Sequence, residues 1–513
     1  MRITQTLRRA VQTRARAPAT LCGDREQTWE TLEARVACLA AGLRALGVAE
    51  GDRVGILALN SDRYLEVIYA VAWAGAVANP VNIRMAPAEI AYTLEDSDAR
   101  VLFVDATFAP MLPALRAAAP SLSHVVYTDD ADRPEGCHAY EEIIAGHARI
   151  DDAEVGGDAL AGLFYTGGTT GKPKGVMLSH DNIMFNTLNG LPALDYDPSA
   201  VYLHAAPMFH LADMSNTHCV TVVGGTHAII PRFDVDALLT MIARAGVTHT
   251  TLVPTMINLL LQSGRVSEYD LSSLRRLLYG ASPMPEALLL QAMEALPNAR
   301  FTQGYGQTEA APIISFLPPE WHYAGSPKLT SAGRPAYGVE AAIRDDKGTE
   351  LPRGSVGEIC ARGNNVMQGY WKRPEQTADT LRDGWLHTGD LGYMDDDGFI
   401  FVVDRVKDMI ITGGENVFSV EVEGALYQHP AVQEAAVIGL PCAQWGERVH
   451  AVVVLKSGSQ ASAEDIQQHC RTLIAGYKVP HSVEFRTESL PVSGAGKVLK
   501  TELRKAHATA AAG

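Results

Sequence analysis

The sequence predicts an α/β fold in which helices cover mainly parallel sheets, and three observations support this class. Helical periodicity and short apolar runs alternate along most of the chain, as in proteins built from strand–helix–strand units. With 47% hydrophobic and 20% charged residues, the composition is that of a globular protein. The most apolar stretch, residues 67–78, is shorter than the roughly 20 residues that span a bilayer, so no integral membrane segment is expected.

Each expected element follows from its local pattern. Apolar residues recur at helical spacing in residues 3–11, 29–46 and 63–74, which predicts helices there. Buried-strand patterns occupy residues 54–59, 101–104, 125–127, 161–165, 227–230, 249–253 and 399–404. Towards the C-terminus we expect strands at 432–438 and 449–455 and helices near 420–427 and 463–473. The tail after Arg504 is expected to be frayed.

A domain boundary is expected where the charged connector 405–408 follows the strand at 399–404. About a hundred residues lie beyond it, which is a typical size for a small domain. The sequence therefore predicts a large N-terminal domain over residues 1–404 and a smaller α+β unit over 408–513.

The charge balance indicates which kinds of partner to expect, and the cysteines indicate the redox state of the compartment. The 43 Lys and Arg against 59 Asp and Glu give a net charge of −16, which disfavours nucleic acid as a partner. The seven cysteines are odd in number and contain no C-x-x-C, which argues against a disulfide scaffold or a structural zinc site and indicates a reducing, cytoplasmic compartment. The Arg-rich first 16 residues faintly resemble a mitochondrial transit peptide, although a surface helix is the favoured interpretation.

The strongest motif is residues 165–175, which directly follow an expected strand. Glycines allow close backbone approach, threonines offer hydroxyls and lysines offer positive charge, so the segment is suited to grip a polyphosphate. The residues concerned are Thr166, Gly167, Gly168, Thr169, Thr170, Gly171, Lys172, Lys174 and Gly175. It is not a Walker loop, because Gly167 and Gly171 are one residue too close and Pro173 replaces the Ser or Thr.

Residues 165–175 resemble the phosphate loop of the adenylate-forming superfamily, which includes acyl-CoA and aryl-CoA synthetases, nonribosomal peptide synthetase adenylation domains and firefly luciferase. The resemblance continues in order along nearly the whole chain, with Gly167 in a position where Ser is usual. It implies a β-subdomain beside the parallel-rich sheets of the N-terminal domain. It also implies a hinge at residues 405–407 and a mobile C-terminal lid.

The resemblance assigns roles to further segments. His210, in Pro207-Met-Phe-His, would flank the acyl carboxylate, and Thr308 would meet the α-phosphate. Glu309 would bind Mg²⁺ with Thr169 as a second ligand, which suits an ion that prefers carboxylates and phosphate oxygens. The adenine would lie between two short segments, Gly280, Ala281 and Ser282 on one side and Gln303, Gly304 and Tyr305 on the other.

Four more assignments complete the resemblance. Asp390 would accept both ribose hydroxyls, and Arg405 would hold the ribose. Gly413 and Gly414 would leave room for a pantetheine arm. Lys497, in a Pro-x4-Gly-Lys setting, would be the catalytic lysine that bridges the acid and the ATP α-phosphate, because both groups are anionic.

The expected reaction is an ATP-dependent acid–CoA ligation with ATP, Mg²⁺ and coenzyme A. Trp445 is a candidate to stack on the coenzyme A adenine, with packing as the equal alternative. The residues near His210 and Glu309 are small or apolar, which favours a medium- or long-chain fatty acid, with a benzoate- or cinnamate-type aryl acid as the alternative. Asp213 and Asn216 could not be placed.

Rival functions share most of these motifs. A ligase that loads a carrier protein is the nearest rival, and a luciferase-type oxygenase is another. A degenerate binding protein is disfavoured because Lys497, Glu309 and Asp390 are all present. The oligomeric state stays open, with a homodimer among the expectations.

Overall fold

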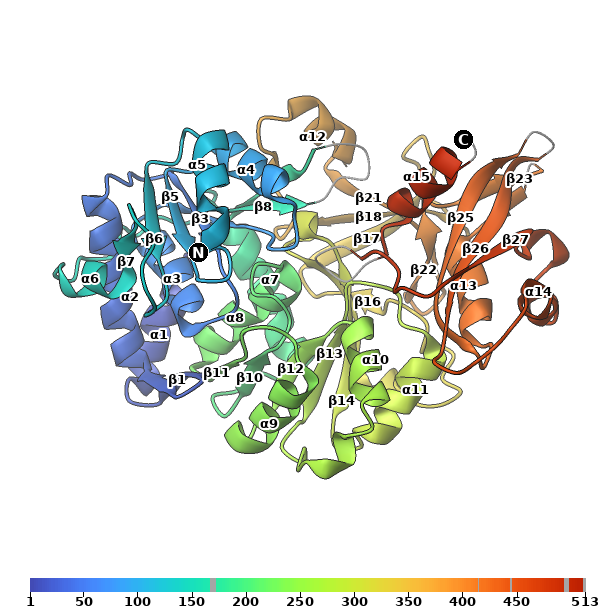
Figure 1. The fold of residues 1–513 in the computed structure, drawn as a ribbon, viewed down its shortest axis with the longest axis horizontal. Helices are drawn as coiled ribbons and strands as arrows, with labels where there is room; N and C mark the ends of the chain where they lie inside the picture. The colour runs from blue at the N-terminus through green and yellow to red at the C-terminus, as the bar shows by residue number, and fades with distance from the viewer. Residues whose placement is uncertain (167–171, 414, 443–444, 493–497, 511–513) are drawn as a thin grey trace.

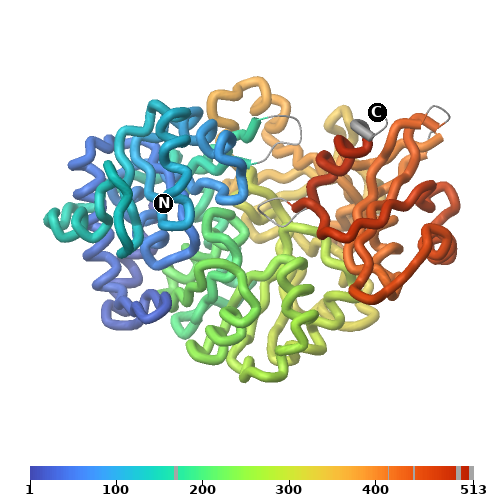
Figure 2. The backbone as a smooth tube through the Cα atoms, viewed as in Figure 1, coloured from blue at the N-terminus to red at the C-terminus, as the bar shows by residue number. Residues whose placement is uncertain are grey.

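The computed structural model describes residues 1–166, 172–413, 415–442, 445–492 and 498–510. Within these ranges the chain forms four sheets, which we call A to D, with helices packed around them (Figure 1). The smooth trace in Figure 2 shows the N-terminal half on the left and below, and the C-terminal residues on the right.

Sheet A has a parallel centre with antiparallel edges. Its order is β16-β15-β14-β13-β12-β10-β11-β1-β2, and the pairs from β1 through β14 are parallel. The strands are β1 (Pro18–Cys22), β2 (Arg25–Thr28), β10 (Val201–His204), β11 (Thr226–Ile229), β12 (His249–Leu252), β13 (Arg276–Gly280), β14 (Arg300–Gly306), β15 (Ile313–Leu317) and β16 (Arg334–Pro335).

Sheet B has the order β19-β9-β8-β4-β3-β5-β6-β7 and is parallel from β8 to β7. Its strands are β3 (Arg53–Leu57), β4 (Val77–Pro80), β5 (Val101–Val104), β6 (His124–Tyr127), β7 (His138–Ala139), β8 (Leu160–Thr166), β9 (Lys174–Ser179) and β19 (Gly369–Tyr370).

Sheets C and D are largely antiparallel. Sheet C contains β17 (Val339–Arg344), β18 (Gly357–Gly363), β20 (Leu381–Arg382), β21 (Trp385–Met394) and β22 (Ile400–Arg405). Sheet D contains β23 (Ile410–Thr412), β24 (Glu415–Val417), β25 (Val432–Cys442), β26 (Gly446–Leu455) and β27 (Ser482–Arg486), the last in parallel with β26.

The helices begin where the sequence supplies caps. Thr28, Ser61 and Ser179 each accept a backbone N–H at the start of α2, α3 and α7, which satisfies groups that the first turn leaves unpaired. The α-helices are α1 (Thr4–Arg14), α2 (Trp29–Ala45), α3 (Asp62–Trp73), α4 (Pro87–Asp96), α5 (Leu112–Ala118), α6 (Tyr140–Ala145), α7 (His180–Leu194), α8 (Leu211–Val223), α9 (Val235–Ala245), α10 (Pro254–Gln262), α11 (Glu286–Ala295), α12 (Pro374–Thr380), α13 (Ser419–Tyr427), α14 (Ala463–Arg471) and α15 (Lys500–Ala510).

Short 3₁₀ turns, η1 to η5, connect some of these elements. They are η1 (Ala109–Met111), η2 (Val266–Glu268), η3 (Thr308–Ala310), η4 (Pro319–Trp321) and η5 (Gly476–Lys478). None of the helices in the described ranges combines the length and apolar character needed to cross a bilayer.

A buried apolar cluster joins α1, α2, α3 and α8 to the strands of sheet B. Trp29, Leu32 and Tyr69 are fully buried in it. A second cluster lies between sheet A and the helices α9, α10 and α11. Sheet D has two clusters of its own, one on each face.

The α/β class is confirmed, and most expected elements are present within one or two residues of their predicted bounds. Sheet C supplies the expected β-subdomain. The prediction of a frayed tail after Arg504 is wrong as far as residue 510, because α15 continues to Ala510 and Leu503 is buried against sheet D. Strand β22 ends at Arg405 and β23 starts at Ile410 in a different sheet, so the predicted connector joins sheets C and D.

A buried ion network joins α2, α3 and α6. The Arg35 guanidinium donates to Glu66 at 2.7 and 3.1 Å and to Glu141 at 2.9 and 2.8 Å, and the Tyr140 hydroxyl donates to Glu66 at 2.5 Å. The Glu66 carboxylate is fully buried. Its charge therefore depends on these donors.

We expect Arg35→Met to lower the free energy of unfolding by about 3–5 kcal/mol, because it leaves the buried Glu66 charge without its cation. Denaturant unfolding measures the change. Arg149→Met is the matched control, since Arg149 pairs with Glu33 while more than half of its side chain is exposed, and it should cost no more than about 1 kcal/mol. Equal effects of the two changes would contradict the expectation.

Candidate active site

The two strands that flank the predicted phosphate loop form a hairpin in sheet B. Thr166 ends β8 and Lys174 starts β9, and the two residues are register partners. The loop residues Gly167, Gly168, Thr169, Thr170 and Gly171 lie outside the described residues. The Lys174 ammonium lies 4.9 Å from the ring centroid of Tyr370, a distance at which a cation interacts favourably with an aromatic face.

The two predicted adenine-binding segments are side by side at the carboxyl ends of β13 and β14. Gly280 and Gly304 are register partners, and a Cβ added at Gly280 would lie 2.1 Å from the Gly304 carbonyl oxygen. Ala281 has a left-handed φ of 65°, which turns the chain sharply before Ser282. Gln303 and Tyr305 continue β14. The close backbone contact at Gly280 is a structural reason for a residue without a side chain there.

Asp390 meets two of the other predicted residues. Its Oδ2 accepts the Tyr305 hydroxyl at 2.8 Å, and its Oδ1 lies 3.1 Å from Arg405 Nε. Burial and the Asp390 carboxylate raise the pKa of Tyr305, so the hydroxyl keeps its proton. Burial lowers the pKa of Arg405, but the neighbouring groups Asp390, Asp408, Tyr305 and Glu309 together raise it by more. Arg405 is therefore a permanent cation beside the carboxylate.

Glu309 has a partner that sequence reasoning missed. Thr308 and Glu309 lie in η3, and Glu309 Oε1 accepts the Tyr370 hydroxyl at 2.7 Å. Burial and the Glu309 charge raise the pKa of Tyr370, which stays a donor. A carboxylate held in this way fits Mg²⁺, which completes its shell with phosphate oxygens and water. The segment Gly369-Tyr-Trp371 contains this partner, but no motif in the sequence analysis gave that segment a role.

His210 caps the start of α8. Its Nδ1 accepts the Ala212 N–H at 3.1 Å, which assigns the ring proton of a neutral imidazole to Nε2. A second missed residue, Asn60, fixes the preceding segment: its Oδ1 accepts the Met208 N–H at 2.7 Å and its Nδ2 donates to the Ala206 carbonyl at 2.9 Å. Asn60 follows β3 at the carboxyl end of the strand, a position that could have drawn attention to it.

The two residues of α8 that sequence reasoning left unplaced are buried and bonded. Asp213 accepts the Tyr202 hydroxyl at 2.9 Å and lies 2.6 Å from His204 Nδ1, inside the core. Asn216 accepts the Tyr196 hydroxyl at 2.9 Å and lies 3.2 Å from Thr251 Oγ1. Tyr196 also stacks on His249 with ring centroids 4.7 Å apart. We call Asn216, Tyr196 and Thr251 the polar wall.

The residues predicted to meet coenzyme A are partly described. The Gly413 N–H donates to the Trp445 carbonyl at 2.8 Å, and a Cβ added at Gly413 would lie 2.9 Å from the Trp445 ring. The structure therefore brings these two residues together. Gly413 directly follows β23 and Trp445 directly precedes β26, and these strands of sheet D lie on the right of Figure 1, whereas β8 lies left of its centre. Gly414 and Lys497 fall outside the described residues.

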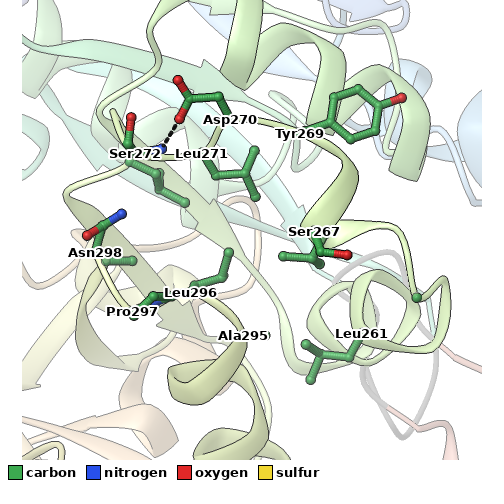
Figure 3. Close-up of a pocket in the computed structure, with 14 residues that line it drawn as sticks. Leu261, Ser267, Tyr269, Asp270, Leu271, Ser272, Ala295, Leu296, Pro297 and Asn298 are labelled. Atoms are coloured by element: carbon green, nitrogen blue, oxygen red, sulfur yellow. Dashed lines mark hydrogen bonds between the residues drawn. The ribbon is translucent and has the colours of Figure 1, made fainter.

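A depression of about 510 Å³ lies elsewhere on sheet A (Figure 3). It is lined by residues that precede β13 and β14, including Leu261, Tyr269, Leu271 and Leu296, and Asp270 accepts the Ser272 N–H at its rim. These residues lie at the amino ends of the two strands, whereas Gly280 and Tyr305 lie at the carboxyl ends. Ligands of open α/β sheets bind at the carboxyl ends, so the depression is separate from the candidate site.

Two family models match the chain. The model described as AMP-binding enzyme matches residues 7–371, and the model described as AMP-binding enzyme C-terminal domain matches residues 421–497. These matches include the segments that carry Thr166, Lys174, Tyr305 and Glu309 in the first case and Trp445 in the second.

Curated relatives and solved structures are similar over almost the whole chain. A feruloyl-CoA synthase of Amycolatopsis sp is 43% identical over 490 residues, covering 95% of this chain and 96% of the relative. A long-chain-fatty-acid–CoA ligase of Mycobacterium tuberculosis is 35% identical, covering 94% of each. The crystal structure of an anthranilate CoA ligase with anthranoyl-AMP has a TM-score of 0.93 at 31% identity, covering 100% of this chain and 98% of the other.

Proposed function

The chain belongs to the AMP-binding enzyme family and is an AMP-forming acyl-CoA synthetase that uses ATP, Mg²⁺ and coenzyme A, and we propose that its acid is a hydroxycinnamate-type aryl acid such as ferulic acid. Similarity to a feruloyl-CoA synthase over 490 residues is the observation that carries the choice of acid. The fatty-acid ligase named above is less similar, at 35% identity.

The reaction has two steps in which the bonds balance. In the first step a carboxylate oxygen of the acid attacks the α-phosphorus of ATP, the bond to the bridging oxygen breaks, and pyrophosphate leaves. In the second step the thiol of coenzyme A attacks the acyl carbon, loses its proton, and AMP leaves with the electrons of the acyl–oxygen bond. Bound Mg²⁺ supplies positive charge that offsets the phosphate charges.

The polar wall supports an aryl acid with polar ring substituents. Asn216 lies six residues beyond His210, which is about 9 Å along a helix axis and comparable with the length of a hydroxycinnamate from carboxylate to para oxygen. Asn216 and Tyr196 place an amide and a hydroxyl group at that depth, bonded to each other, and Asn216 Nδ2 also donates to the Ala212 carbonyl and to Thr251. The expectation of a fatty-acid substrate remains an untested prediction. A comparison of aryl and fatty acids as substrates decides between the two classes.

We assign the described residues the roles that their contacts support. Tyr305, Asp390 and Arg405 would hold the nucleoside, because one carboxylate already lies between a hydroxyl and a guanidinium. Thr166, Lys174, Thr308 and Glu309 would meet the phosphates and Mg²⁺. His210 would contact the acyl carboxylate through its Nε2–H. Gly280, Ala281, Ser282, Gln303 and Gly304 would enclose the adenine, since their two strands are adjacent.

A movement of the C-terminal unit belongs to the same proposal. Gly413 follows β23 and Trp445 precedes β26, strands on the right of Figure 1, whereas β8 lies left of its centre, and we infer that sheet D turns relative to sheets A and B when these residues serve coenzyme A. The connector after β22 is where such a hinge would act, because residues 406–409 join two sheets without being part of a strand. The predicted boundaries 1–404, 405–407 and 408–513 remain part of this proposal.

We predict that the enzyme prefers hydroxycinnamates to fatty acids and dicarboxylic acids. In ATP–pyrophosphate exchange, kcat/KM with ferulate and 4-coumarate should exceed that with octanoate, palmitate and malonate at least about 10-fold. Asn216→Leu should lower kcat/KM for 4-coumarate by roughly 10-fold and leave cinnamate within about 2-fold, since cinnamate has no ring hydroxyl to lose a partner. A preference for palmitate would overturn the choice of acid and leave the ligase activity standing.

We also predict that only the first of the two steps depends on Lys497. Lys497→Ala should slow ATP–pyrophosphate exchange at least about 100-fold, because the cation that stabilises the transition state is gone. Thioester formation from supplied feruloyl-adenylate and coenzyme A should stay within about 2-fold of the original rate. Lys456→Ala is the control, since Lys456 donates to the Pro430 carbonyl on the surface of the same unit. Equal loss in both steps would refute the assignment.

We expect Tyr370 to position the Glu309 carboxylate. Tyr370→Phe should raise the Mg²⁺ concentration for half-maximal exchange by about 3- to 10-fold, because one hydrogen bond to the metal ligand is lost. The rate at saturating Mg²⁺ should change less than about 2-fold. Tyr393→Phe is the matched control, since Tyr393 stacks on Phe401 in sheet C. An unchanged Mg²⁺ requirement in Tyr370→Phe would contradict the role.

A further inference from the structure

Three side chains of types that can bind a metal meet on the face of sheet D that α15 covers. His450 lies on β26, Glu484 on β27 and His507 on α15. His450 pairs with Ser482 and Val452 with Glu484, so these alternate positions share one face of the two parallel strands. Leu503 packs on that face with Val452, and His507 follows it by one helical turn.

The three donor atoms have the spacing of a small metal site. The two imidazole Nε2 atoms are 3.1 Å apart, and Glu484 Oε2 lies 2.7 Å from His507 Nε2 and 3.9 Å from His450 Nε2. Bonds of about 2.0–2.1 Å in tetrahedral geometry separate two Zn²⁺ ligands by roughly 3.3 Å. The three observed distances lie on either side of that value, so small side-chain adjustments suffice.

A further contact orients the buried histidine. His450 Nδ1 lies 2.7 Å from Ser482 Oγ. When the Nδ1–H donates to this hydroxyl, the Nε2 lone pair points at the other two donors, as second-shell partners arrange it in metal sites.

We propose that His450, Glu484 and His507 bind a divalent transition metal, with Zn²⁺ as the best match, and that water completes the coordination. Two imidazoles and a carboxylate are a donor set that Zn²⁺ accepts. The Glu484 and His507 side chains are 38% and 24% exposed, which leaves solvent access for the fourth ligand. The Arg486 guanidinium lies 3.9 Å from Oε1 of Glu484, the oxygen that faces away from the cluster.

The site would anchor the second half of α15 to sheet D, beyond the contacts that Lys500, Leu503 and Arg504 make. At the start of the helix, Lys500 donates to Ser419 at 2.6 Å and pairs with Glu423 at 2.7 Å, and Arg504 pairs with Asp408 at 2.9 Å. His507 is the next link along the helix. The inferred role is structural, and it does not depend on which acid the enzyme activates.

A second group of donors in the described part of the chain does not make a comparable site. Glu358, Cys360 and His387 also gather in sheet C. There Arg382 and Glu358 both lie 2.6 Å from Nδ1 of His387. Burial raises the pKa of the Cys360 thiol to about 12, which keeps it protonated. The guanidinium repels a cation and a metal would have to displace the thiol proton, whereas the three donors of the sheet D cluster include neither group.

The test uses the full chain, purified without a C-terminal tag and stripped with a chelator. Titration with Co²⁺ should give visible absorption bands of tetrahedral type at one ion per chain, and Zn²⁺ should displace it. His450→Gln, Glu484→Gln and His507→Gln should each weaken Zn²⁺ binding at least about 10-fold in competition with a chromogenic chelator. His469→Gln is the matched control, because His469 lies on α14 in the same unit and contacts His429 rather than the cluster, and it should bind as tightly as the original chain.

Thermal unfolding gives an independent readout that also checks folding. Zn²⁺ should raise the unfolding midpoint of the original chain and of His469→Gln, because a ligand that binds only the folded state stabilises it, and it should leave His507→Gln unchanged. Circular dichroism with chelator present should match for all variants. Absence of stoichiometric binding, or equal affinity in the three ligand variants and the original chain, would show a hydrogen-bonded cluster only and would overturn the proposal.

Discussion

The buried carboxylate of Asp390 is the contact on which the geometry of the candidate site depends. It is only 6% exposed, and a carboxylate removed from water is costly unless both oxygens find partners. Tyr305 on β14 supplies one partner and Arg405 on β22 supplies the other. Because β14 belongs to sheet A and β22 to sheet C, this one anion holds two sheets together. It does so at the point where the chain leaves for sheet D.

Much of this arrangement could be predicted from the sequence, for a physical reason. The parallel centre of sheets A and B comes from buried runs such as residues 101–104 and 249–253, in which local hydrophobicity already decides the structure. The pairing of Gly280 with Gly304 follows from two short motifs at the carboxyl ends of adjacent strands. Motif order placed Tyr305, Asp390 and Arg405 in one site, and the structure brings these three into contact.

The residues that were missed act through partners distant in sequence. Tyr370 reaches Glu309 across 61 positions and Asn60 reaches Met208 across 148, and no local pattern reports such a contact. The helix at the C-terminus was missed because small and polar residues after Arg504 read as a frayed end, whereas Leu503 and His507 gain contacts only once sheet D exists. The cysteine count argued against structural zinc, but it has no bearing on a site made of histidine and carboxylate.

The choice of tyrosine beside the two acids bears on how an acidic protein binds anionic ligands. Glu309 and Asp390 would repel phosphates, yet pairing each with a lysine would use up the positive charge that the ligands need. Tyr370 satisfies one oxygen of Glu309 with a neutral hydroxyl instead, and Tyr305 does so for one oxygen of Asp390, whose other oxygen pairs with Arg405. Tyr370 also presents its ring face to the Lys174 ammonium at 4.9 Å, which holds the cation without neutralising it. The positive potential around Lys174 is therefore retained, although the chain has a net charge of −16.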